Sequence, residues 1–107
     1  MEHQEFKSEH FFDEHGNPTG GHSSATGVCI AWQHGPLGKG DDRKAPNGAL
    51  IGTVLDMVID RLNFFQASEF ASDYNAEAIE HITRAIDALD RRTKDRQERG
   101  VEGTNVQ

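Results

Sequence analysis

The residues best suited to chemistry lie along one face of the segment 73–104. Positions three or four residues apart run from Asn75 through an apolar series to Arg92 and Arg96. In an α-helix these positions share one face. The apolar middle of that face needs a partner helix, whereas the amide at one end and the two guanidinium groups at the other need hydrogen-bond acceptors. The pattern allows anion binding; the commoner alternative is a last helical turn of solvated arginines favoured by the helix dipole.

Aromatic side chains could complete such a binding site. Phe65 and Phe70 lie close to the point where one helical pattern ends and the next begins, and Phe64 and Tyr74 lie beside them. An aromatic ring that stacks on a nucleobase while arginines hold the phosphates is an ordinary way to bind a small nucleotide. The alternative, which the spacing favours, is that Phe65 is the last core position of its helix.

Other reactive residues lack the spacing that catalysis or metal binding requires. Five of the six histidines fall in the first third of the chain, none of them in an HxH, HxxxH or HExxH pair: His3, His10, His15, His22 and His34. The glycine-rich segment 35–40 departs from the spacing of a phosphate-binding loop, and the acid pairs are typical of loops and solvated helix faces. We therefore predict no catalytic residues, no metal site, no cofactor and no enzymatic activity.

Two helices must position the site residues. Ile51, Leu55, Val58, Leu62 and Phe65 follow a 4-3-4-3 spacing, so the helical pattern begins near Ala49. After a break at 67–72, a second helix begins with Asp73 or Asn75 as its cap and ends at Gly100. So short a break predicts an antiparallel hairpin. At about 1.5 Å per residue the helices measure roughly 30 and 40 Å, so the end of the second should extend past the first.

The first 48 residues have a different pattern. Segment 1–14 is either a fraying terminus or an edge strand that ends at Phe11–Phe12, and 15–21 reads as a turn because it holds a proline and three glycines. Residues 27–33 alternate as a half-buried strand, which we pair with the first segment in a hairpin. The sequence predicts one α+β domain, 1–107, with a small N-terminal antiparallel β-sheet packed on the C-terminal two-helix hairpin. Its parts are a β-rich part and loop (1–48), the hairpin (49–100) and a tail (101–107).

Composition limits the classes of partner. The 107 residues carry a net charge of −7, which argues against binding to polymeric nucleic acid or acidic membranes. The bases gather between Arg84 and Arg99, and a local cationic patch suits a small anion. No apolar run approaches the roughly 20 residues of a membrane span, and the single Cys29 suits a reducing cytoplasm. A hydrophobic content of 35% makes a modest core, so association is expected.

Four stretches resemble a known family. They are D-E-H-G-N-P-T-G-G (13–21), W-Q-H-G-P-L-G (32–38), P-N-G-A (46–49) and A-x-x-x-L-x-x-R-T-x-x-R-x-x-R-G-V-E-G-T (85–104). The first three resemble phage Thoeris anti-defence proteins, which sequester signals of the cyclic ADP-ribose type. The fourth resembles the helical hairpin that these proteins share with anti-CBASS sponges.

The resemblance implies a non-enzymatic sponge that acts in the cytoplasm of an infected bacterial host. Such proteins pack a small sheet on two long helices, form homo-dimers and in many cases hexamers, and bind glyco-cyclic ADP-ribose without cleaving it. Some bind cyclic di- or trinucleotides at a separate site. The alternative function is an oligomeric helical-hairpin interaction module that inhibits a host protein directly.

The resemblance also implies the ligand-binding residues. Asn75, Arg92 and Arg96 match the family's polar positions, the stacking aromatic matches Phe65 or Phe70, and a linker arginine matches Arg43. The N-terminal helix of the anti-CBASS sponges has no counterpart in 1–12. Asn75 and Arg96 lie roughly 31 Å apart along one helix, so they can hold one small ligand only if they come from different subunits of an antiparallel dimer.

Overall fold

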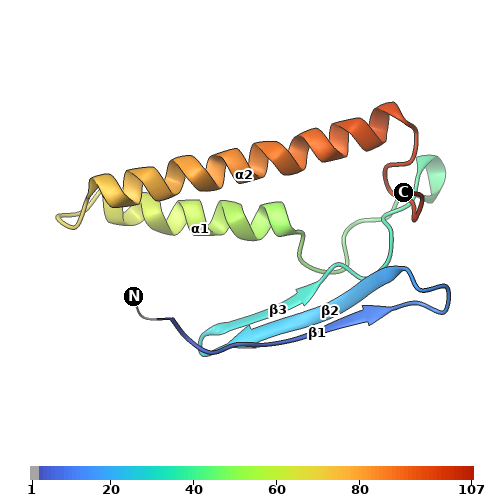
Figure 1. The fold of residues 1–107 in the computed structure, drawn as a ribbon, viewed down its shortest axis with the longest axis horizontal. Coiled ribbons are helices and arrows are strands. Elements are labelled where there is room, and N and C mark those ends of the chain that lie inside the picture. The colour runs from blue at the N-terminus through green and yellow to red at the C-terminus, as the bar shows by residue number, and fades with distance from the viewer. Residues whose placement is uncertain (1–2) are drawn as a thin grey trace. The chain divides into compact units, whose positions relative to one another are not determined.

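A computed structural model describes residues 3–107 and shows a three-stranded antiparallel sheet followed by two helices (Figure 1). The elements are β1 (Lys7–Phe12), β2 (Pro18–Ala25), β3 (Val28–Trp32), the 3-10 helix η1 (Gly40–Asp42), α1 (Ile51–Gln66) and α2 (Asp73–Glu98). The α+β fold class is thereby confirmed. The chain divides into two compact units, which we call the sheet unit (residues up to Leu50, with Val101–Gln107) and the helical unit (Ile51–Gly100). That the sheet packs on the hairpin stays a prediction.

The sheet has the order β1-β2-β3, with β2 in its centre. Glu9 pairs with His22 across the first ladder, and Ser24 pairs with Cys29 across the second. β1 is therefore the edge strand that ends at Phe12. The predicted hairpin between the first segment and 27–33 was wrong, however, because residues 18–25 form a strand between them.

The central strand was missed because its sequence, PTGGHSSA, contains no alternation of apolar side chains. Its glycines are needed for close approach instead. A Cβ atom on Gly21, whose φ is +156°, would overlap the carbonyl oxygen of Glu9, and one on Gly20 would lie 2.5 Å from the ring of His34. Both glycines are buried. Close packing of the strand backbone against Glu9 and the His34 ring, rather than apolar burial, thus explains this strand.

The true turn between β1 and β2 spans residues 13–17. The Asp13 carboxylate accepts the backbone N–H groups of His15 at 2.8 Å and Asn17 at 2.9 Å, and Gly16 adopts a φ of +79°. The pKa of Asp13 lies below its usual value, chiefly because the Asn17 N–H stabilises the ionised carboxylate. The Asp13 carboxylate therefore holds the turn closed through these hydrogen bonds, and the turn depends on the ionised form of Asp13.

Two side-chain amides close the loop between β3 and α1. Asn47 accepts the N–H of His34 at 2.8 Å and donates to the carbonyl of His34 at 3.0 Å, while Gln33 Oε1 accepts the N–H of Asn47 at 2.9 Å. Ala49 then forms a parallel bridge with Trp32. These contacts give the W-Q-H-G-P and P-N-G-A stretches a structural role, because they join the two ends of the loop between β3 and α1. They also explain why α1 begins at Ile51 rather than Ala49.

The helical unit is an antiparallel hairpin, as predicted (Figure 1). Its N-terminal cap on α2 is neither Asp73 nor Asn75 but Ser72, whose hydroxyl accepts the N–H of Asn75 at 3.1 Å. Ser72 has the extended backbone that a cap requires, whereas Asp73 and Asn75 already lie within the helix. Gly100, with a φ of +73°, follows the last turn.

α2 has 26 residues and α1 has 16, so α2 extends about 15 Å past α1. The predicted overhang is confirmed. Neither helix has a fully buried side chain, and α1 exposes Ile51, Met57, Val58 and Phe64. In residues 3–107, none of the helices is both long and apolar enough to cross a membrane.

Candidate functional site

The tip of the hairpin is held by a network around Gln66. Gln66 Nε2 donates to the carbonyl of Ser72 at 3.0 Å, and Oε1 accepts both the Ser72 N–H at 2.9 Å and the Asn75 side-chain amide at 3.1 Å. Asn75 Nδ2 also donates to the carbonyl of Phe70 at 3.3 Å. Because the Asn75 amide nitrogen already donates twice inside the hairpin, the group that Asn75 can offer to a ligand is its side-chain carbonyl oxygen, as a hydrogen-bond acceptor.

Aromatic side chains surround this network. Phe65 is partly buried and packs edge-to-face on Phe64, with ring centroids 5.6 Å apart. Phe70 is 67% exposed, and its backbone is fixed because Ser68 Oγ accepts its N–H at 3.1 Å and donates to the carbonyl of Phe65 at 2.6 Å. The structure thus brings Phe65, Phe70 and Asn75 to one end of the hairpin. Either ring could stack on a ligand.

Arg61, the one basic residue of α1, lies beside the aromatic rings and was not predicted as a site residue. Its guanidinium carbon lies 4.8 Å from the ring centroid of Phe64 and 5.1 Å from that of Phe65. These distances are within the range of cation–π contacts. The sequence does mark Arg61 as unusual, because the residues three and four positions away in both directions are all apolar: Met57, Val58, Phe64 and Phe65.

Arg92 and Arg96 lie at the other end of α2, one turn apart on the overhang. Arg92 is exposed and Arg96 partly buried. Nearby arginines form i,i+4 ion pairs: Arg84 of α2 with Glu80 at 2.6 Å, and Arg99, which caps the C-terminus of α2, with Asp95 at 3.0 Å. Along one straight α2, the separation of Arg96 from Asn75 is about 31 Å, so a single chain does not bring the two ends of the predicted site together.

Arg43 belongs to the sheet unit, where it holds the C-terminal tail. Its Nη1 donates to Glu102 at 2.6 Å and to the carbonyl of Gly38 at 3.2 Å. The Gly38 N–H in turn donates to the carbonyl of Gly103 at 2.8 Å. Residues 102–103 therefore dock on the loop that carries Arg43. An anionic ligand would have to compete with Glu102 for this guanidinium.

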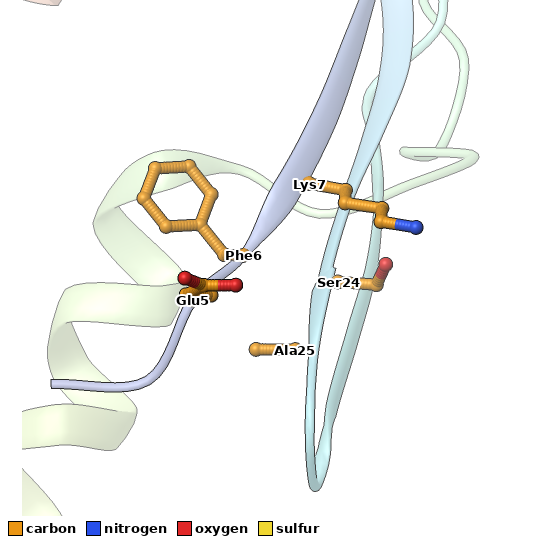
Figure 2. Close-up of a pocket in the computed structure, with 5 residues that line it drawn as sticks. All are labelled: Glu5, Phe6, Lys7, Ser24 and Ala25. Carbon is orange, nitrogen blue, oxygen red and sulfur yellow. The ribbon is translucent and has the colours of Figure 1, made fainter.

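The sheet unit also has a shallow hollow of about 370 Å³, lined by Glu5, Phe6, Lys7, Ser24 and Ala25 (Figure 2). It contains none of the predicted site residues. Within residues 3–107, no group of three or more His, Cys, Asp and Glu side chains is placed to hold a metal ion. The assignments of all six predicted ligand-binding residues remain predictions: Phe65, Phe70, Asn75, Arg92, Arg96 and Arg43.

Comparison with known proteins agrees with the sequence motifs. No family model matches the chain. The chain is 46% identical over 78 residues to a protein of Bacillus phage SBSphiJ7 named Thoeris anti-defense 1. The match covers 73% of this chain and 52% of the relative, so the chain spans about half of the relative's length. The similarity confirms the resemblance of this chain to the Thoeris anti-defence family.

Proposed function

We propose that this protein is a phage anti-defence sponge that binds and sequesters a cyclic nucleotide immune signal without cleaving it. Glyco-cyclic ADP-ribose is the proposed ligand, and cyclic di- and trinucleotides are a second class, bound at a separate site. The similarity to a Thoeris anti-defence protein supports the biological role. The structural observation that supports the proposal concerns the two ends of α2. Aromatic rings and the Asn75 amide lie at one end, and Arg92 and Arg96 lie at the other.

The two ends suit a site shared between two subunits. Midway between positions 75 and 96 lie Ala85 and Ile86. Two α2 helices that cross antiparallel at this point would place Asn75 of one subunit level with Arg96 of the other. Ala85 is exposed and small, which permits the helix spacing of about 8–10 Å that packed helices adopt. Arginine side chains can bridge that spacing.

The residues of the proposed site have complementary chemistry. The ring of Phe65 or Phe70 offers a face for the base, the Asn75 carbonyl accepts from a ribose hydroxyl or an amino group, and the arginines bind phosphate oxygens bidentately. Phenylalanine, asparagine and arginine supply neither a nucleophile nor a general base at neutral pH. This site would therefore hold the nucleotide intact and lower its free concentration.

Mixing two inactive variants tests the shared site. Phe65→Ala and Arg96→Glu should each abolish binding of glyco-cyclic ADP-ribose. After subunit exchange, an equal mixture should regain about a quarter of the sites, because half of the dimers are mixed and each has one intact site. No recovery after verified exchange would contradict a site shared between subunits.

The second candidate is a helical interaction module that inhibits a host protein. The exposed apolar residues of α1, including Met57 at 65% and Phe64 at 59%, favour it. Arg96→Glu separates the two functions. The sponge predicts lost nucleotide binding with unchanged assembly in sedimentation, whereas the module predicts that the assembly changes.

A further inference from the structure

We propose that Arg61 is a further ligand-binding residue, which contacts a phosphate of the nucleotide whose base stacks on the aromatic rings at the hairpin tip. The inference rests on the proposed function and deepens it. It adds a cation from the same chain as Phe65, in addition to the arginines that the second subunit supplies.

The position of Arg61 is unusual for a surface arginine. It is exposed, yet its helical neighbours at three and four positions are apolar, so no i,i+4 carboxylate is available to it. The ion pairs described in residues 3–107 do not include it. Arg84, by contrast, has Glu80 one turn away at 2.6 Å. Asp56 and Asp60 of the same helix lie outside the i,i+3 and i,i+4 spacings that would pair them with Arg61.

The aromatic contacts position this charge. The Arg61 guanidinium lies 4.8 Å from the ring centroid of Phe64 and 5.1 Å from that of Phe65. A guanidinium placed against aromatic rings keeps N–H groups in its own plane for bidentate contact with an oxyanion. The rings limit the freedom of the side chain, so less conformational entropy is lost when an anion binds.

This placement specifies the class of ligand. One cation approaches from the aromatic side, and the partner subunit's Arg92 and the partner subunit's Arg96 supply cations from the other side. A ligand with one phosphate cannot place a separate phosphate against each set of guanidinium groups. A nucleotide with two or more phosphates, such as a dinucleotide or a cyclised diphosphate, can. The site should therefore prefer the latter class.

Calorimetric titration of three single variants with glyco-cyclic ADP-ribose tests the proposal. Arg61→Met keeps the aliphatic stem, and we expect it to weaken binding at least tenfold and to reduce the salt dependence of Kd, because one charge-assisted contact is lost. Arg61→Lys should bind between Arg61→Met and the unmodified protein. Arg84→Met is the matched control: it makes the same change in an exposed arginine of α2, and it should bind within about twofold.

Subunit mixing distinguishes a ligand contact from a change in fold. Arg61→Met mixed with Arg96→Glu should regain about a quarter of the tight sites, because the two residues of each site come from different subunits. Arg61→Met mixed with Phe65→Ala should regain none, because one subunit supplies both residues and every hairpin tip in the mixture lacks one of them. Tight binding by Arg61→Met and Arg61→Lys equal to that of Arg84→Met would overturn the role of Arg61 and leave the proposed function intact. No binding by the unmodified protein would overturn both.

Discussion

Replacing Gln66 by alanine should destabilise the hairpin and displace a proposed ligand-binding group at the same time. The Gln66 side chain takes part in three hydrogen bonds of 2.9–3.1 Å, two with the backbone of Ser72 and one with the Asn75 amide. Each hydrogen bond contributes about 0.5–1.5 kcal/mol net to the free energy of unfolding. The higher helix propensity of alanine offsets about a few tenths of a kcal/mol of the loss. We expect a loss of about 2–3 kcal/mol in the free energy of unfolding.

The assay is thermal unfolding followed by circular dichroism at one fixed protein concentration, because association would make Tm depend on concentration. A loss of that size lowers Tm by roughly 10–20 °C in a chain of this length. Asn63→Ala is the control, since it removes an exposed amide from the same helix and should change the stability by less than about 0.5 kcal/mol.

A double-mutant cycle adds a sharper test of the network. Gln66→Ala and Asn75→Ala should show a coupling of about 1 kcal/mol in the free energy of unfolding, because they remove the same hydrogen bond. Gln66→Ala should also weaken nucleotide binding, although Gln66 is not a proposed ligand contact. If Gln66→Ala unfolds at the same temperature as Asn63→Ala, the inferred role of the network is wrong.

Three further predictions concern the sheet unit. Glu102→Gln should speed amide exchange at Gly38, measured by NMR, because the ion pair that holds the tail is lost; the overall stability should change by less than about 1 kcal/mol, since the pair is partly exposed. Gly21→Ala should lower Tm far more than Gly20→Ala, because its new Cβ would overlap backbone, whereas at Gly20 it would meet a side chain that can move; equal losses would contradict this packing. The Asp13 carboxyl should titrate below 3.8 in an NMR pH series; its stabilising contribution is therefore present above the unfolded pKa and lost as the pH falls through the folded pKa, and Asp13→Asn should remove this acid dependence.

The sequence predicts the helical unit better than the sheet unit, for a physical reason. Within the 4-3-4-3 series, Leu55, Leu62 and Phe65 are partly buried, whereas Ile51 and Val58 are exposed. The spacing therefore predicts the helix and its pairing with α2, although it does not predict every buried position. The strand at 18–25 instead packs closely against the backbone of Glu9 at Gly21 and against the His34 side chain at Gly20. Glycine pairs read as turn signals, so the pattern alone favours the wrong structure there.

The residues of the candidate site also differ in how well the sequence predicts them. Asn75, Arg92 and Arg96 lie on a periodic face, so helical spacing alone could place them. Gln66 and Arg61 act through contacts that depend on three-dimensional geometry: one bonds to a backbone carbonyl six residues away, and the other stacks on neighbouring rings. Their roles could not be derived before the hairpin was described.

The central claim is tight binding without cleavage. The most direct test is calorimetric titration of the purified protein with glyco-cyclic ADP-ribose, followed by release of the bound nucleotide by heat and its identification by mass spectrometry. The proposed sponge predicts saturable, tight binding and recovery of the unaltered nucleotide. Recovery of a cleaved product, or failure to bind this nucleotide and the cyclic di- and trinucleotides, would contradict the proposed function.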